Sequence, residues 1–301
     1  VQDRESNLSH FGLRTGLFQR SLMPLSRHEL WQKIAKQLSG QHANDDARQI
    51  LMNVCACDHA SFLAHLETPV SRAERRRVWR MARCRARGVP MAYLLKFRAF
   101  FGRAFFVNRH VLIPRPETEI LVEEALKLPT PDLVIDVGTG SGAIGITLAL
   151  EQSAPVIATD ISRRAIRVAK QNARHLGARV RFLRANLLDH PLIADAVRQA
   201  SSVLVAANLP YLTPALLADS PREVKEYEPC LALLADNDDG LSLYRKLFAQ
   251  LAKYDIRHTL LIEIDPRQSD AAMALAQSFF PTATIRLIND LSNCARIIRI
   301  D

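Results

Sequence analysis

Two hydrophobic patterns divide the chain. In the first part, apolar residues recur every three to four positions, as at Leu30, Ile34 and Leu38, which is the spacing of one buried helix face. Ser26 and Ser71 each stand three residues before a glutamate, a capping-box pattern in which hydroxyl and carboxylate satisfy exposed backbone amides at a helix start. These features predict a small bundle of short amphipathic helices.

Short buried strands alternate with amphipathic helices in the second part. Strands are predicted at 132–137, 155–160, 179–184 and 203–207, and helices at 146–150 and 161–173. This alternation predicts a parallel, doubly wound sheet whose ligand site lies at the carboxyl ends of the strands. Residues 223–235 are expected to form a surface insertion with a short strand. A strand at 259–264 and an antiparallel hairpin of 283–288 and 295–300 are expected to complete the sheet.

Breaks in these patterns give the domain boundaries. Residues 1–22 are rich in Ser, Arg and Asn without periodicity, so we expect a disordered leader or a start assigned too far upstream, with Met23 as the true start. Asp3 and Glu5 disfavour a transit peptide. Beyond the leader we expect three parts, namely a helical domain at 23–88, an aromatic β-hairpin connector at 89–112, and the domain with the sheet at 113–301.

Composition narrows the class of protein. Of the 301 residues, 48% are hydrophobic and 24% charged, as in a soluble protein with a core. No uncharged apolar run reaches about 18 residues, so we expect no membrane-spanning helix. The five cysteines include no CxxC pair, and the histidines show no metal-ligand spacing. We therefore predict a reducing compartment, the cytoplasm rather than an organellar matrix, with no metal site and a monomeric chain.

The positive charge is concentrated in one predicted helix. The net charge of +9 and the pI near 9.6 favour an acidic partner. Residues 72–87 hold eight arginines against a single acidic residue, Glu74. Such a run is either a solvated helix face or a docking surface for an acidic protein or for RNA phosphates.

The ends of the first two predicted strands carry candidate cofactor chemistry. Strand 132–137 runs into Gly138-Thr139-Gly140-Ser141-Gly142, whose alternate glycines let the backbone approach a ligand closely. This spacing, after the acidic residue Asp136, is typical of S-adenosylmethionine sites rather than of dinucleotide sites. Asp160 ends the next strand, where it either accepts both hydroxyls of a cofactor ribose or caps the following helix.

The third and fourth strands end in amides. Asn186 is placed to bond an adenine amino group, with Leu187 against the ring face. Asn208-Leu209-Pro210-Tyr211 puts a polar amide at the end of a buried strand, before a stiff corner and an aromatic residue. That arrangement suits a binding site, although Asn208 could instead cap its own backbone in a turn.

A second candidate for ligand binding precedes the sheet. Arg115 is held between Pro114 and Pro116, and Glu117 opens the following helix. A rigid arginine suits a ligand carboxylate or phosphate, whereas acidic residues in a first turn also simply suit the helix dipole.

Five segments together resemble the release-factor glutamine N5-methyltransferases over about Met23 to Asp301. They are Ile113–Glu119 (Ile-Pro-Arg-Pro-Glu-Thr-Glu), Asp136–Gly142, Asp160, Asn208–Tyr211 and Glu228–Leu233. The resemblance implies a Rossmann-like class I S-adenosylmethionine-dependent methyltransferase domain with a seven-stranded sheet. It also implies a helical N-terminal domain for recognising the release factor, and a hairpin connector between the two.

The resemblance also implies an activity and roles for residues. The methyl group of S-adenosylmethionine would pass to the side-chain nitrogen (N5) of the glutamine in the GGQ motif of class 1 peptide chain release factors. Gly138 to Gly142, Asp160, Asn186 and Leu187 would bind the cofactor. Asn208 to Tyr211 would hold the glutamine, with Asn208 also touching the cofactor and with Arg115 and Glu117 completing the substrate site.

Leu209 departs from the family motif N-P-P-Y. N-L-P-Y also resembles the motif of rRNA adenine dimethyltransferases, but the segment Pro114–Glu119 is not expected in those enzymes. We expect Asn208 Oδ1 and the Leu209 carbonyl to accept the two amide N–H groups, with Tyr211 against the amide plane. Leucine keeps the carbonyl and loses only backbone rigidity. Alternatives are methylation of a ribosomal protein glutamine or an rRNA adenine, or a non-catalytic ribosome-binding factor with this fold.

Overall fold

The computed structural model describes residues 25–38, 40–235, 239–254 and 257–301. The chain divides after Leu95 into two compact units, each of which is described by itself. The leader expected at residues 1–22 lies outside the described residues. Among the residues described, no helix is both long and apolar enough to cross a membrane.

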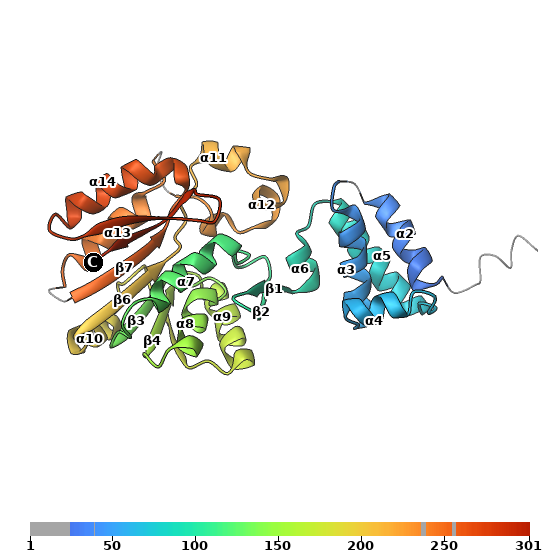
Figure 1. Ribbon diagram of the computed structural model, residues 1–301, viewed down its shortest axis with the longest axis horizontal. Helices are drawn as coiled ribbons and strands as arrows, with labels where there is room; N and C mark the ends of the chain where they lie inside the picture. The colour runs from blue at the N-terminus through green and yellow to red at the C-terminus, as the bar shows by residue number, and fades with distance from the viewer. Residues whose placement is uncertain (1–24, 39, 236–238, 255–256) are drawn as a thin grey trace, which may run out of the picture. The chain divides into compact units, whose positions relative to one another are not determined.

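The N-terminal unit is helical, as the spacing of apolar residues predicts. Both capping boxes are confirmed, and in the first the Glu29 N–H donates to Ser26 Oγ at 3.2 Å while the Ser26 N–H donates to Glu29 Oε2 at 3.0 Å. Leu30, Ile34 and Phe62 are fully buried in its core. The helices are α2 (Arg27–Gln37), α3 (Ala43–Cys55), α4 (His59–Ala64), α5 (Arg72–Ala86) and α6 (Met91–Leu95) (Figure 1).

Helix α5 is strongly two-sided. Its apolar side buries Val78 and Ala82, and Arg85 pairs with Asp46 of α3 across 2.6 Å. The other side is exposed to solvent and carries Arg72, Arg76, Arg77, Arg80 and Arg83, and the exposed Arg87 follows directly after the helix. Six of the eight arginines in the run are therefore exposed to solvent, which is what either interpretation of it requires.

The second unit opens with an antiparallel hairpin, β1 (Phe97–Phe100) and β2 (Arg103–Phe106). Gly102, at φ +70°, makes the turn. Phe100 and Phe105 are buried edge to face, with ring centroids 5.9 Å apart, against apolar residues of helices α7 (Glu119–Leu126) and α8 (Ala143–Glu151).

The predicted seven-stranded sheet is confirmed, with strand order β5-β4-β3-β6-β7-β9-β8. Strands β3 to β7 are parallel, and β9 runs antiparallel to both β7 and β8. The bounds are β3 (Leu133–Val137), β4 (Val156–Asp160), β5 (Val180–Arg184), β6 (Ser202–Ala207), β7 (Arg257–Glu263), β8 (Ile285–Asn289) and β9 (Ala295–Ile300).

Helices cover both faces of this sheet (Figure 1). On one face lie α7, α8 and α9 (Arg163–Leu176); on the other lie α10 (Pro191–Gln199), α13 (Ser242–Leu251) and α14 (Ser269–Phe279). Because both faces are covered, β3 and β6 read as nearly continuous apolar runs. Val134 contributes to one core and Ile135 to the other, as strand alternation requires.

Four short elements differ from the sequence prediction. Residues 91–95, predicted as part of the hairpin connector, form helix α6, and the first strand of the hairpin begins only at Phe97. Residues 223–235 form helix α12 (Arg222–Tyr227) and a 3₁₀ turn (Cys230–Ala232) rather than a strand, and only Leu234 bridges to Leu212. Pro229 prevents α12 from continuing. A single bridged residue pair is too short to make a β-strand. Helices α10 and α11 (Pro214–Asp219) were not predicted, although each begins at a proline, a known helix-start signal.

Candidate active site

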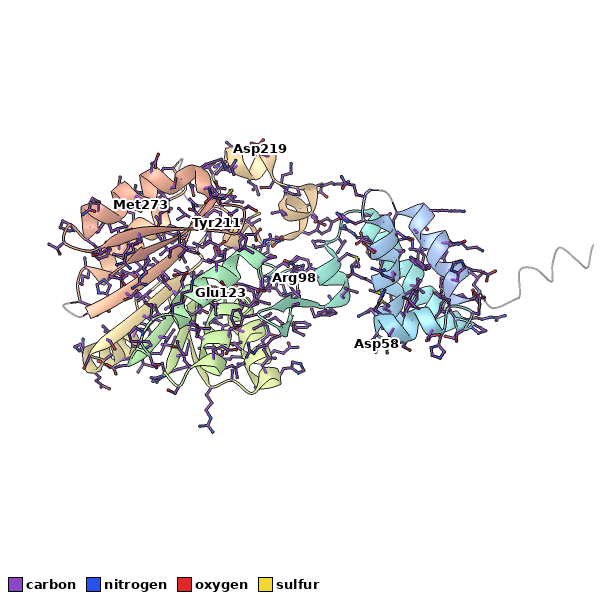
Figure 2. The ribbon with its side chains drawn as sticks, in the orientation of Figure 1. Asp58, Arg98, Glu123, Tyr211, Asp219 and Met273 are labelled. Atoms are coloured by element: carbon purple, nitrogen blue, oxygen red, sulfur yellow. The ribbon has the colours of Figure 1, made fainter. Side chains whose placement is uncertain are left out.

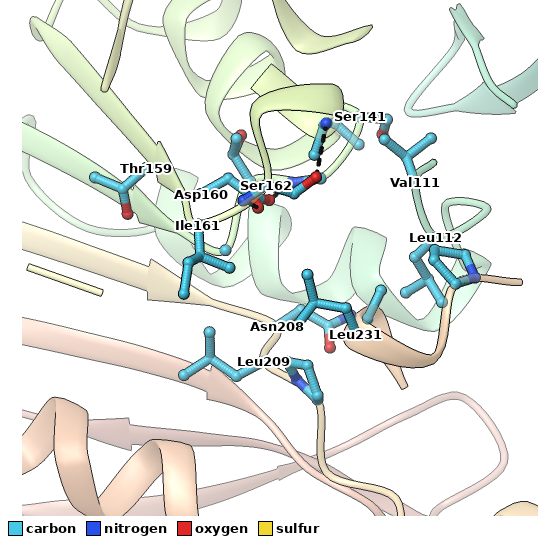
Figure 3. Close-up of a pocket in the computed structure, with 18 of the residues that line it drawn as sticks. Val111, Leu112, Ser141, Thr159, Asp160, Ile161, Ser162, Asn208, Leu209 and Leu231 are labelled. Atoms are coloured by element: carbon cyan, nitrogen blue, oxygen red, sulfur yellow. Dashed lines mark hydrogen bonds between the residues drawn. The ribbon is translucent and has the colours of Figure 1, made fainter. Parts of the chain in front are cut away.

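A cavity of about 470 Å³ opens at the carboxyl ends of β3, β4, β5 and β6, a volume typical of ligand sites. The strand order reverses between β3 and β6, and open α/β sheets bind ligands at such a switch point. Val137 pairs with Ala207, so Gly138 and Asn208 leave neighbouring strands side by side. Figure 3 shows Asn208 and Leu209 across the pocket from Asp160 and Ile161.

The glycine loop follows β3 and requires glycine at specific positions. Gly138 has φ +75°, and a Cβ there would lie 2.8 Å from Leu209 Cδ2. Gly142 has φ +87°, and a Cβ there would lie 2.5 Å from Ile146 Cδ1 in the first turn of α8. Side chains at these positions would combine backbone strain with overlap, so the loop keeps its backbone against the pocket.

Asp136, the acid before the loop, is fully buried and faces away from the pocket. Its Oδ2 accepts from Thr139 Oγ1 at 2.5 Å and from the Gly145 N–H at 2.8 Å. Burial raises the pKa of Asp136 to about 6, and these two hydrogen bonds partly oppose the rise. Asp136 therefore shapes the glycine loop from behind.

Asp160 stands at the pocket wall, as its strand-end position predicts. Its Oδ2 accepts from the Gly140 N–H at 2.9 Å and its Oδ1 from the Ser162 N–H at 2.8 Å. Each carboxylate oxygen has a second lone pair, so the group can still accept hydroxyl donors from a ligand. Burial raises the pKa of Asp160.

Asn186 and Leu187 line the same pocket after β5. Leu187 is buried with φ +58°, a left-handed conformation that is costly for leucine. Gln250 of α13 supports this turn, since its Oε1 accepts from the Leu188 N–H at 2.8 Å and its Nε2 donates to the Asn186 carbonyl at 3.4 Å. Asn186 is exposed, so its side chain is available to a ligand.

The corner after β6 is held by hydrogen bonds to two distant parts of the chain. Asn208 Nδ2 donates to Thr118 Oγ1 at 3.0 Å. The Leu209 N–H donates to the Tyr244 hydroxyl at 3.1 Å, and that hydroxyl donates to the Glu263 carbonyl. The Leu209 side chain is buried, while Asn208, Leu209 and Pro210 all contribute to the pocket wall.

Tyr211 lies beside the strands of the sheet rather than among the residues that line the pocket (Figure 2). Its hydroxyl donates to Glu263 Oε1 at 3.4 Å, and its carbonyl accepts from Gln268 Nε2 at 2.9 Å. Burial raises the pKa of Tyr211, so the phenol stays protonated. Glu263 is 1% exposed, and burial raises its pKa to about 7.

Arg115 reaches the pocket but already has an ionic partner. Its Nη2 lies 2.5 Å from Oε1 of Glu228, a carboxylate whose side chain is 1% exposed. The second oxygen of Glu228 accepts from the Ile113 N–H at 3.1 Å. Glu117 is half-buried, is not among the pocket-lining residues, and raises the pKa of Glu263 through its charge.

Several residues that support the pocket escaped the sequence prediction. Asn172 of α9 is fully buried, and its Nδ2 donates to the Ser141 carbonyl at 2.8 Å and to the Phe106 carbonyl at 3.0 Å. An asparagine on the apolar face of a helix is a usable sequence signal. Thr118 lies within the motif segment Ile113–Glu119, but that segment does not show which of its residues supports the pocket, and Gln250 resembles an ordinary surface residue of a helix.

Two family models match the chain. The model described as a methyltransferase domain matches residues 132–219, which hold the glycine loop, Asp160 and Asn208. The model described as the PrmC N-terminal domain matches residues 29–95, which form the helical unit. Among solved structures, the hMettl16 catalytic domain in complex with MAT2A 3′UTR hairpin 6 is similar in fold. It has a TM-score of 0.50 and 14% identity over 77% of this chain and 82% of that chain.

Sequence relatives are much closer. The release factor glutamine methyltransferase of Bacillus subtilis (strain 168) is 36% identical over 84% of this chain and 89% of its own length. That of Enterococcus faecalis is 40% identical over 69% and 74%, and that of Neisseria gonorrhoeae 40% identical over 67% and 72%, respectively. The resemblance of the motifs thus extends over both units, and the chain belongs to the family of release factor glutamine methyltransferases.

Proposed function

We propose that this protein transfers a methyl group from S-adenosylmethionine to the N5 side-chain nitrogen of the glutamine in the GGQ motif of class 1 peptide chain release factors. The observation that carries the proposal is the register of β3 and β6, which sets the Asn208 corner beside the glycine loop. The membership of the chain in the family of release factor glutamine methyltransferases supports the same substrate.

The cofactor half of the pocket fits S-adenosylmethionine. Glycines at 138, 140 and 142 keep side chains out of the loop, and Asp160 retains lone pairs for ribose hydroxyls. Asn186 and Leu187 border the pocket where an adenine would lie. When bound, S-adenosylmethionine supplies an electrophilic methyl group on a sulfonium.

The Asn208 corner suits an amide acceptor. A carboxamide nitrogen is a weak nucleophile because its lone pair is delocalised into the carbonyl, so the protein must orient it. In the proposed mechanism, Asn208 Oδ1 and the Leu209 carbonyl would accept the two N–H groups of the glutamine. Most of the rate enhancement would then come from positioning and from fixed dipoles.

Leucine at 209 is compatible with this role. The Leu209 N–H donates to the Tyr244 hydroxyl, a hydrogen bond that proline cannot make, and the side chain packs against Gly138. These contacts supply the rigidity that a proline ring would otherwise provide.

The solvent-facing arginines of α5 are proposed to dock the protein substrate. Five exposed arginines on α5, with Arg87 directly after it, attract an acidic surface and speed encounter, with a strong dependence on salt. The same groups could contact ribosomal RNA phosphates, so the acceptor must be identified directly.

The test is acceptor competition. Labelled S-adenosylmethionine is supplied with purified release factor, intact ribosomes and free ribosomal RNA together, and the label is located by mass spectrometry. We expect it on the GGQ glutamine of the release factor. Label on a ribosomal protein or an RNA base instead would refute the proposed substrate, and failure to bind S-adenosylmethionine in calorimetry would refute the enzymatic role.

A further inference from the structure

The buried residue Thr118 connects the Asn208 corner to the interior of the sheet. It is the last residue of the 3₁₀ turn η1 (Pro116–Thr118), and only 4% of it is exposed. Its Oγ1 accepts from Asn208 Nδ2 at 3.0 Å, over a separation of 90 residues in sequence. The contact therefore holds the side-chain amide of Asn208 at the pocket wall.

The direction of this hydrogen bond matters chemically. The oxygen and nitrogen of a carboxamide lie on opposite sides of its carbon, so when Nδ2 faces Thr118, Oδ1 faces away from it. In the described part of the chain no donor reaches Asn208 Oδ1, which leaves it as an acceptor for a ligand. If the Asn208 amide were reversed, its N–H groups would face the N–H groups of the glutamine. Both are donors, so no hydrogen bond could form between them.

A threonine hydroxyl alone cannot enforce that direction, because it can either donate or accept. Its single hydrogen must be directed elsewhere, and the buried carboxyl of Glu263, whose pKa is lowered by Thr118, is the candidate acceptor for it. Among the described residues, Glu263 Oε2 is buried without a hydrogen-bond partner. The Thr118 hydroxyl is the donor whose interaction most opposes the raised pKa of this carboxyl.

We propose that Thr118 is a positioning residue that fixes which end of the Asn208 amide faces the substrate, and that the Glu263 carboxylate keeps Thr118 as the acceptor in this contact. This role rests on the proposed methylation of a glutamine amide. A carboxylate can only accept, so the Thr118 hydrogen points to Glu263 and its oxygen lone pair to Asn208.

Protonation of Glu263 would remove this constraint. Its neighbours are Tyr211, whose hydroxyl lies 3.4 Å from Oε1, Thr118, Arg296 of β9 and Glu117 of η1. Burial and Glu117 raise the pKa of Glu263, while Thr118, Arg296 and Tyr211 lower it, giving a value of about 7. Below that pH a protonated Glu263 can donate to Thr118, which frees the Thr118 hydrogen for Asn208 Oδ1.

The first test separates the hydroxyl of Thr118 from its volume. Thr118→Val keeps the shape and removes the hydroxyl, whereas Thr118→Ser keeps the hydroxyl and removes a methyl group. We expect Thr118→Val to lower kcat on release factor about 100-fold with unchanged S-adenosylmethionine affinity, since small errors in orientation cost that much. The kcat of Thr118→Ser should stay within about threefold of the wild-type value.

The matched control is Thr147→Val. Thr147 is fully buried in α8, and its hydroxyl donates to the Ala143 carbonyl one turn earlier in the same helix. The kcat of Thr147→Val should stay within about twofold of the wild-type value, because no hydrogen-bond partner outside the helix is lost. Wild-type kcat in Thr118→Val, or an equal loss in Thr118→Ser, would overturn the role of Thr118.

The second test is the pH profile of kcat, which also serves if Thr118→Val does not fold. In the wild type, kcat should fall as the pH is lowered through about 7. In Glu263→Gln that decline should be absent, since the amide does not titrate. An identical decline in the variant would overturn the role of Glu263. Inactive wild-type protein would refute the proposed function instead, so the two failures are distinguishable.

Discussion

The two sides of the pocket are built in opposite ways. On the cofactor side, Asp136 holds the glycine loop through contacts 3 and 9 residues away in sequence. On the acceptor side, Asn208 and Leu209 are held by partners 90 and 35 residues away. The contacts of Asp136 with the glycine loop lie within one strand, turn and helix, whereas the Asn208 corner is held by segments far away in the chain.

Each side also has a buried carboxyl group behind it. Asp136 lies behind the glycine loop with its pKa raised to about 6, and Glu263 lies behind the Asn208 corner with its pKa raised to about 7. Desolvation is the main cause in both cases, yet the carboxyls act differently. Asp136 accepts hydrogen bonds from the Gly145 N–H and the Thr139 hydroxyl, while Glu263 is proposed to set the polarity of a side-chain hydrogen bond.

The largest expected effect is on the acceptor side. Asn208→Ala should lower kcat by about 1,000-fold, because it removes an oriented acceptor at the reacting nitrogen. The affinity for S-adenosylmethionine should change by less than about fivefold, since the glycine loop and Asp160 remain. Single-turnover kinetics and calorimetry measure the two quantities. Asn289→Ala, at an exposed site on β8, is the control and should match wild type.

On the cofactor side, Gly145→Ala should destabilise the loop. The added Cβ would lie 2.8 Å from Asp136 Oδ2 and 3.0 Å from Asp136 Cβ. We expect a loss of up to about 3 kcal/mol in the free energy of unfolding, as for overpacked cores, together with weaker cofactor binding.

Gly177→Ala is the control for that change. Gly177 ends α9 at φ +74° with no atom within 4 Å of an added Cβ, so only backbone strain of about 1–2 kcal/mol is expected. Equal loss of cofactor affinity in both variants, measured by calorimetry, would show that Asp136 has no special link to the loop.

The raised pKa of Glu263 predicts a stability effect on the acceptor side. The folded state binds this proton more tightly than the unfolded state, whose carboxyl titrates near 4.5. The contribution is therefore most favourable below pH 4.5 and is lost as the pH rises through about 7.

Comparison with Glu263→Gln isolates that contribution. Between pH 5 and 8 the variant should gain about 2 kcal/mol of stability relative to wild type, as measured by denaturant unfolding. The surface variant Glu226→Gln should differ from wild type by the same free energy of unfolding at every pH in this range. If the difference in the free energy of unfolding between Glu263→Gln and wild type is also the same at every pH, Glu263 does not titrate between pH 5 and 8.

The smallest effect is expected outside the pocket. Arg76→Glu combined with Arg80→Glu on α5 should lower kcat/KM at low salt about three- to tenfold and weaken its salt dependence. Lys33→Glu combined with Lys36→Glu makes the same charge change on α2 of the same unit. If both double variants behave alike, net charge rather than the α5 surface accounts for the effect.

The contrast between local and long-range contacts also explains what could be predicted from the sequence. The strands, the glycine loop and the positions of Asp160 and Asn208 follow from patterns within a few residues, and the structure brings them to one edge. Pairing of Arg115 with Glu228, and of Thr118 with Asn208, joins segments more than 85 residues apart. No local pattern encodes such pairs, so the supporting residues became visible only in the fold.

The most direct test compares Asn208→Ala with Asp160→Ala at increasing S-adenosylmethionine concentration, with release factor in excess. If the two sides act separately, Asp160→Ala binds the cofactor about 10- to 100-fold more weakly but recovers most of its single-turnover rate at saturation. Asn208→Ala binds the cofactor and stays slow at every concentration. Recovery of Asn208→Ala at saturation, or its methylation of release factor at the wild-type rate, would contradict the role assigned to Asn208.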